Sequence, residues 1–140
     1  MNFNWLSYLE VAKILVQEVN SSCKQETDLS LKEAKIRSSI SRAYYSAFCL
    51  ARNYLRDIEN DSELQNLKTD VHKYVINKFL ACENPELREI GEELGMLRRM
   101  RNLADYNDKA SNNDYILFSN GNEALNLANN IITFLETLYH

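Results

Sequence analysis

The feature that most restricts the fold of this chain is its shortage of residues that break helices. The 140 residues include only three glycines and one proline, whereas Leu, Ala, Glu, Lys and Asn are frequent. Such a sequence has almost no β-hairpin signals, and its residue types favour long helices. We therefore expect an all-α protein.

Apolar residues recur every three or four positions in five segments, which is the spacing of one face of a helix. Helices are predicted over about Phe3–Ser22, Ser30–Arg56, Leu67–Ala81 and Pro85–Asp108, and a last one ends near Leu138. We expect an antiparallel bundle of about five helices that forms one domain over residues 1–140. A domain of this size can bury a sufficient core without disulfides or metal.

Local signals indicate where some of these helices begin. Ser30 and Glu33 have the spacing of a capping box, as do Asn120 and Glu123, and Pro85 suits a first helical turn. The second predicted helix is unusually rich in small residues, which would let other helices approach closely, so we expect it at the centre of the bundle. Those small residues are Ser38, Ser39, Ser41, Ala43, Ser46, Ala47 and Ala51.

The cysteines and apolar runs exclude several classes of protein. Cys23, Cys49 and Cys82 are odd in number and form no C-x-x-C pair, which argues against a disulfide framework and a zinc site. No apolar run approaches the roughly 20 residues of a membrane span, and the first residues lack the basic start of a signal peptide. We expect a cytoplasmic protein that needs no cofactor and no metal.

Charge is distributed unevenly along the chain. The net charge of -4 argues against a general polyanion binder. The segment Leu31–Arg56, however, holds six basic residues and one acid, Glu33, so its charge is +5 and that of the remainder is -9. This segment is either a local basic surface or a solvated helix face.

The stretch LRRMRNLADYND, residues 97–108, places a charge where an apolar residue is expected. The apolar stripe of the fourth predicted helix runs through Ile90, Leu94 and Leu97, and Arg101 occupies its next position. A guanidinium buried alone would be prohibitive, so Arg101 must meet a partner, a cavity or a second subunit. Asp105, one turn further on, is the nearest candidate, and a plain intrahelical ion pair is the simplest interpretation.

Three short motifs occur in a recognisable order. SRAYYSAF (residues 41–48), VHKYVINKF (71–79) and RNLADY (101–106) together resemble the HEPN domain family, and most closely its small stand-alone prokaryotic branch with an R-x-x-A-D-Y motif. The resemblance implies a compact helical bundle that usually dimerises. In catalytic members, R-x(4–6)-H motifs from two subunits meet and form a metal-independent ribonuclease site.

The sequence departs from this family at the position of the motif histidine. The residues with the required spacing after Arg101 are Tyr106, Asn107 and Asp108. A tyrosine with a pKa near 10 and an aspartate with a pKa near 4 are poor proton carriers at neutral pH. Loss of a general acid or base typically costs about 10²- to 10⁴-fold in rate, so we expect weak or absent cleavage.

Candidate site residues fall into two groups. A variant ribonuclease reaction would use Arg101, Asp105, Tyr106 and His72. Phosphate contacts and base stacking would use Arg42, Tyr45, Arg98 and Asn102. For His72 the alternative is a partly buried, hydrogen-bonded residue, and for the tyrosines it is a place in the core or an interface. We expect Tyr45 to share a polar strip with Arg42, Ser38 and Ser46 that faces Arg101.

Three functions remain open at this point. The first is a module that binds RNA or nucleotide, with weak or no ribonuclease activity, as a homodimer or a subunit of a larger assembly. The second is an active endoribonuclease with a variant motif, and the third is a structural or dimerisation module in which Arg101 and Asp105 join two subunits. The resemblance also implies a prokaryotic defence or toxin–antitoxin setting, a nucleotidyltransferase partner, and adenylylation of a tyrosine near Tyr106.

Overall fold

The computed structural model describes residues 3–21, 29–107 and 114–139, with side chains of the last range described from residue 119. This part of the chain contains six helices and no strand: α1 (Leu6–Ser21), α2 (Leu29–Asp57), α3 (Ser62–Asn66), α4 (Val71–Leu80), α5 (Pro85–Tyr106) and α6 (Asp114–Leu138). The prediction of an all-α bundle is confirmed. Cys23, His140 and the predicted helix end at Asp108 lie outside the described residues.

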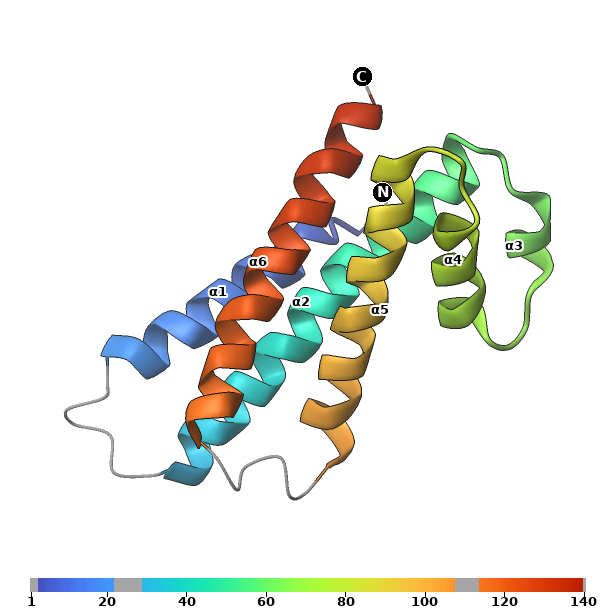
Figure 1. Cartoon of the computed structure of the whole chain (residues 1–140). Helices are drawn as coiled ribbons and strands as arrows, with labels where there is room; N and C mark the ends of the chain where they lie inside the picture. Colours follow the sequence, from blue (N-terminus) through green and yellow to red (C-terminus); the bar gives the residue numbers. More distant parts are fainter. Residues whose placement is uncertain (1–2, 22–28, 108–113, 140) are drawn as a thin grey trace.

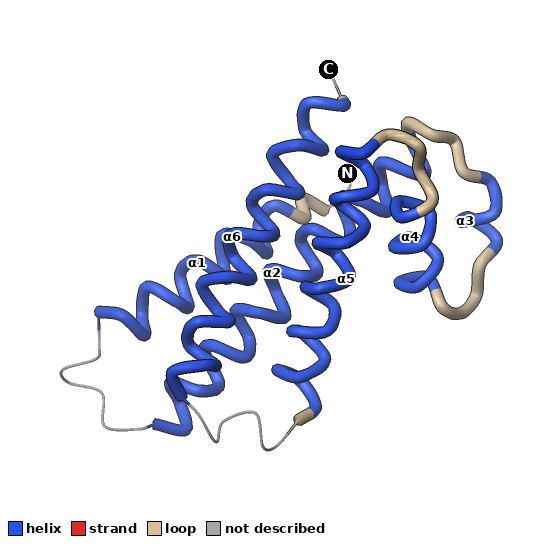
Figure 2. The backbone as a smooth tube through the Cα atoms, viewed as in Figure 1, coloured by secondary structure: helices blue, strands red, loops and turns tan. Residues whose placement is uncertain are grey.

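Four long helices form the body of the protein. α1, α2, α5 and α6 run alternately down and up along one another, while α3 and α4 lie together at one end (Figure 1). α2 packs against α1, α5 and α6, and α4 packs mainly on α5. Figure 2 shows that the described loops gather around α3 and α4. His72, near the start of α4, contacts Tyr44 and Phe48 in the middle of α2.

The small residues of α2 explain its central place. Ala43, Ala47 and Ala51 are fully buried, so the backbones of neighbouring helices come close to this face. Two buried serines of α2 donate hydrogen bonds to backbone carbonyls near the start of the chain. Ser39 donates to Ala12 and Ser46 donates to Trp5, each over 2.9 Å. The bundle thereby buries these hydroxyls without leaving them unpaired.

Several predicted boundaries are wrong. α2 begins at Leu29 and α6 at Asp114, so Ser30 and Asn120 lie inside helices and cap neither. A capping pattern is only local, and helix-forming residues on either side can continue the helix through it. The third predicted helix begins at Val71 instead of Leu67.

α3 was missed because five residues are too few to show helical periodicity. Its start is set by the carboxylate of Asp61, which accepts hydrogen bonds from the backbone N–H groups of Glu63 and Leu64 over 3.1 and 3.2 Å. The buried side chain of Leu64 then anchors the helix to the core.

Candidate nucleic-acid interface

Arg101 lies on the buried face of α5, in line with Ile90, Leu94 and Leu97. Its residue surface is only 8% exposed. The Nη1 atom of Arg101 lies 3.9 Å from Oδ2 of Asp105, and Ser41 of α2 donates a hydrogen bond to the same oxygen over 3.3 Å. The structure thus contains the expected ion pair, at the long end of the ion-pair range.

Three tyrosine rings surround the guanidinium of Arg101. Its Cζ atom lies 5.3 Å from the ring centre of Tyr44, 5.2 Å from that of Tyr45 and 6.0 Å from that of Tyr106. At these distances the ring faces attract the cation. The Nε atoms of Arg101 and Arg98 are buried and have no hydrogen-bond acceptor among the described residues. The contacts shown for the Arg101 charge are thus the three rings and Asp105.

His72 of α4 meets α2 beside this cluster. Its Nδ1 atom lies 2.6 Å from the hydroxyl of Tyr44, and its ring stacks on Phe48 with 4.1 Å between ring centres. Burial, followed by the charges of Arg101, Arg98 and Arg52, lowers the pKa of His72 to about 4. His72 is therefore neutral at pH 7.

Tyr44 determines which ring nitrogen of His72 carries the proton. Burial raises the pKa of Tyr44, so its hydroxyl keeps its proton at neutral pH. That hydroxyl can donate to Nδ1 of His72, and the neutral imidazole then carries its own proton on Nε2. The structure therefore favours the interpretation of His72 as a partly buried, hydrogen-bonded residue.

A hollow of about 410 Å³ opens between the start of α1, the middle of α2 and the start of α4. We call it the aromatic pocket. Arg42 lies over the ring of Tyr8 with its Cζ 4.9 Å from the ring centre, and Arg52 lies over Trp5 at 5.5 Å. The pocket lining contains no acidic residue: it consists of Trp5, Tyr8, Arg42, Tyr45, Phe48, Cys49, Arg52, Val71 and His72.

Five of the six basic residues in the basic segment of α2 fall into two groups; Lys32 belongs to neither. Lys35, Arg37 and Arg56 each form an ion pair, with Glu18 at 3.2 Å, Glu33 at 2.9 Å and Asp57 at 2.8 Å respectively. These ion pairs compensate the three charges, and Arg37 also donates hydrogen bonds to three carbonyls at the end of α5, so it is not part of a merely solvated helix face. Arg42 and Arg52 instead line the aromatic pocket, and no described carboxylate lies within ion-pair distance of either. Two positive charges of the basic segment therefore lie at the aromatic pocket.

The predicted site residues meet only in part. Arg101, Asp105, Tyr45 and Tyr106 form one cluster, and Arg98 lies close enough to lower the pKa of His72. Tyr45 also lines the aromatic pocket, together with His72 and Arg42. One expectation is wrong, because Ser46 bonds to the carbonyl of Trp5 and does not face Arg101. Asn102 is exposed and does not line the pocket, and its role in RNA binding stays a prediction.

Sequence reasoning missed several residues of the pocket, among them Trp5, Tyr8 and Arg52. These three belong to the first predicted helix and to the basic segment, which gave no reason to pair them. The one signal was the tryptophan itself, which is unique in the sequence and lies near an end of the chain.

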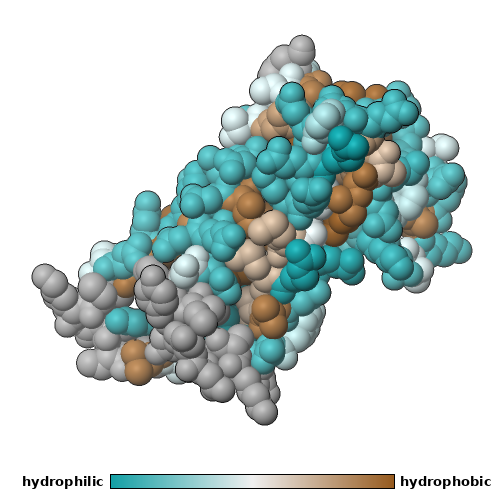
Figure 3. Space-filling view, viewed as in Figure 1, coloured by the Kyte–Doolittle hydropathy of each residue, from teal (hydrophilic) through white to brown (hydrophobic). Residues whose placement is uncertain are grey.

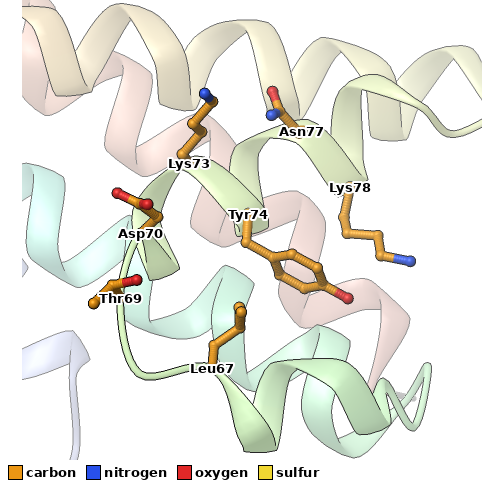
Figure 4. Close-up of a pocket in the computed structure, with 7 residues that line it drawn as sticks. All are labelled: Leu67, Thr69, Asp70, Lys73, Tyr74, Asn77 and Lys78. Atoms are coloured by element: carbon orange, nitrogen blue, oxygen red, sulfur yellow. The ribbon is translucent and has the colours of Figure 1, made fainter.

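A second hollow, of about 390 Å³, lies on the outer side of α4 (Figure 4). Its lining mixes Lys73 and Lys78 with Asp70. The hydroxyl of Tyr74, which also lines it, donates to Asp61 over 2.7 Å, and Nζ of Lys78 lies 3.8 Å from the same carboxylate. Because its charges are balanced within the structure, this hollow is a weaker candidate for an anionic ligand than the aromatic pocket.

The described residues contain no group of three or more His, Cys, Asp or Glu that could hold a metal ion. None of their helices has the length and apolar character needed to cross a membrane. Fold and site together define a helical bundle in which an arginine of α5 is buried against tyrosines of α2. The chain belongs to the HEPN domain family, whose model matches residues 22–138.

One relative is the uncharacterized protein MJ0628 of Methanocaldococcus jannaschii, which is 27% identical over 114 residues. The match covers 74% of this chain and 63% of the relative, so the chain spans less than two thirds of that protein. A search of solved structures found no match. α1 and the residues before it precede the part matched by the HEPN model.

Proposed function

We propose that this HEPN protein binds RNA or a nucleotide and has weak or no ribonuclease activity. The observation that carries the proposal is the convergence of Arg42, Tyr45 and His72 on one open hollow without acidic side chains. Arginine binds phosphate oxygens through several donors, and aromatic rings stack on bases, so this combination suits single-stranded RNA. The family suggests a prokaryotic defence or toxin–antitoxin system as the setting.

Weak cleavage follows from the state of the residues around the motif. Arg101 is buried and paired with Asp105, which limits its access to a phosphate. His72 is neutral at pH 7 and its Nδ1 faces Tyr44, so it has little capacity to act as a general acid. Tyr106, which stands in place of the motif histidine, is 73% exposed.

We also propose that the protein acts as a homodimer or as a subunit of a larger assembly. Three large apolar residues of α5, Met96, Leu103 and Tyr106, are exposed. The space-filling view shows hydrophobic side chains gathered in a strip between largely hydrophilic areas on the side that carries α5 and α6 (Figure 3). Exposed apolar surface of this kind suits a protein partner, either a second copy or a nucleotidyltransferase.

The test is a gel-shift titration with labelled single-stranded RNA, without metal and at low salt. Arg42→Gln should weaken RNA binding by about tenfold and reduce the salt dependence, because one phosphate contact is lost. Arg56→Gln is the matched control, since Arg56 lies on the same helix but is paired with Asp57. Equal RNA affinity of wild type and Arg42→Gln would refute the proposed interface.

The same gels decide between the proposal and an active endoribonuclease. The wild type would be an enzyme with a variant motif if it cleaves the RNA and Arg101→Ala does not, provided that circular dichroism shows an unchanged fold of the variant. A shift without cleavage supports the binding module.

A structural role is the second candidate, and the burial of Arg101 against Asp105 favours it. In that case Arg101→Ala should dissociate a dimer in light-scattering measurements, and the protein should not bind RNA at any salt concentration.

The exposure of Tyr106 also bears on its modification. We propose it as the tyrosine that a nucleotidyltransferase partner would adenylylate, because its side chain is accessible and follows the motif directly. Mass spectrometry of protein produced together with such a partner should show one added adenylyl group, which Tyr106→Phe should abolish.

A further inference from the structure

We infer that the aromatic pocket is a site for one nucleoside monophosphate unit, with the base stacked on the pocket rings and the phosphate held by Arg42 and Arg52. The inference deepens the proposed function and rests on it for the kind of ligand. The unit is either a free nucleotide or one residue of an RNA strand. Arg101, Asp105 and Tyr106 do not line this pocket, and Trp5 and Tyr8 precede the residues that the HEPN model matches, so the pocket is distinct from the R-x-x-A-D-Y motif.

The size and walls of the pocket suit a planar base. Its volume of about 410 Å³ lies within the range of about 300–1,000 Å³ that is common for small-ligand sites. Three walls carry rings from different elements: Trp5 and Tyr8 from the start of the chain, Tyr45 from α2 and His72 from α4. Trp5 and Tyr8 meet edge to face, with 5.5 Å between ring centres. A base entering the pocket would stack on the ring faces that Arg42, Arg52 and Phe48 do not already cover.

The charge of the pocket suits a phosphate. Arg42 and Arg52 contribute two positive charges, the lining contains no acid, and His72 remains neutral at pH 7. Each guanidinium lies over a ring. One face of the planar guanidinium is thus in contact with the ring, while the N–H groups at the edge of the guanidinium can still donate hydrogen bonds.

The donors of the two arginines are also largely available. Arg52 donates through Nε and Nη2 to Oδ1 of Asn53, over 3.2 and 3.1 Å, which positions its guanidinium without neutralising it. Neither Arg42 nor Arg52 has a carboxylate within ion-pair distance among the described residues. In a protein of net charge -4, two arginines on one hollow without a direct ion pair favour an anionic ligand, although the charge of Arg52 also acts on Asp57.

Trp5 provides a direct assay because it is the only tryptophan of the chain and lines the pocket. The whole protein is titrated with AMP, UMP, adenosine, inorganic phosphate and a short single-stranded oligoribonucleotide, and Trp5 fluorescence is followed. The monophosphates should quench it. Adenosine should bind about tenfold or more weakly, because it lacks the charge that the arginines hold, and phosphate alone should not quench.

The variants separate the pocket from general electrostatics. Arg42→Gln and Arg52→Gln should each weaken AMP binding by about tenfold in calorimetric titration, which does not depend on the fluorescence of Trp5. Arg56→Gln, one turn after Arg52 and paired with Asp57, should bind AMP as the wild type does. Circular dichroism confirms that each variant keeps its helices.

Each outcome points one way. Absence of AMP and UMP binding together with an RNA shift that does not quench Trp5 would overturn the pocket and leave the proposed function standing. Quenching by AMP without any RNA shift would support the pocket as a site for a free nucleotide and overturn RNA as the ligand. If the oligoribonucleotide quenches Trp5 in the wild type but not in Arg52→Gln, this would support the pocket as the place where one residue of an RNA strand binds.

Discussion

The neutral state of His72 leads to a pH dependence of stability that can be measured. The pKa of His72 is lowered from 6.5 to about 4 in the folded protein, mainly by burial and then by the charges of Arg101, Arg98 and Arg52. Between these two pH values the unfolded chain binds a proton at this side chain and the folded protein does not. The free energy of unfolding should therefore decrease as the pH falls from 6.5 towards 4.

The size of this effect follows from the two pKa values. One pKa unit corresponds to about 1.4 kcal/mol, and integration between pH 7 and about pH 5 yields a loss of at most about 2 kcal/mol from His72 alone. This is a large part of the stability of about 5–15 kcal/mol that is typical of a small domain.

Urea unfolding, followed by the circular dichroism of the helices at both pH values, measures the loss. His72→Gln is the control, because a glutamine can accept the hydrogen bond from Tyr44 but cannot be protonated. All carboxylates, and His140, are present in both proteins and cancel in the comparison. The wild type should lose about 2 kcal/mol more than His72→Gln between pH 7 and about pH 5.

Two results would refute this reasoning. One is an identical pH dependence in wild type and His72→Gln. The other is an imidazole titration of His72 near pH 6.5 in nuclear magnetic resonance spectra, which would show that burial and the arginines do not hold it neutral. His72 would then again be a candidate for proton transfer in a ribonuclease reaction.

Three further predictions concern the scaffold of the site. A Cβ atom at Gly91 would lie 2.8 Å from a backbone nitrogen of α4, so Gly91→Ala should lower the free energy of unfolding in urea by about 1–3 kcal/mol. At Gly95 the nearest neighbour of a Cβ atom would lie at 3.8 Å, so Gly95→Ala should raise this free energy by up to about 1 kcal/mol. A change of the same sign in both variants would contradict close packing of α4 on α5. Arg37 donates hydrogen bonds to three carbonyls at the end of α5, one of them over 2.7 Å. Arg37→Met should therefore lower the free energy of unfolding by about 1–2 kcal/mol and speed amide hydrogen exchange in the last turn of α5. Unchanged exchange would show that Arg37 does not hold the end of α5. Burial alone would raise the pKa of Asp61, but the hydrogen bonds from Tyr74 and neighbouring N–H groups lower it overall. Tyr74→Phe should therefore lower the free energy of unfolding by about 1 kcal/mol at pH 7, and by less as the pH falls through the pKa of Asp61. A difference in urea stability that does not change with pH would argue against this bond.

Much of the fold could be predicted because helix formation leaves a local record. The four long helices of the bundle could be predicted because glycines and prolines are few and apolar residues recur every three to four positions. The small residues of α2 correctly indicated its central place. The failures were also local: α3 is too short to show a period, and the patterns at Ser30 and Asn120 resemble caps although the helices continue through them.

The motif around Arg101 shows where this kind of prediction ends. Its burial and its pairing with Asp105 follow from positions within a single helix, so the sequence by itself determined them. That Tyr44, Tyr45 and Tyr106 surround the guanidinium depends on how α5 packs against α2. The missing motif histidine was also evident from sequence, because it concerns the order of residues alone.

Only the tertiary structure decided the aromatic pocket and the state of His72. Trp5, Arg42 and His72 come from three separate segments, and nothing in their local patterns shows that the segments meet. Desolvation and the charges of distant arginines, which lower the pKa of His72, exist only after α2, α4 and α5 have packed. The sequence determined the helices and their apolar faces because these depend on neighbours along the chain, whereas the candidate site depends on neighbours in space.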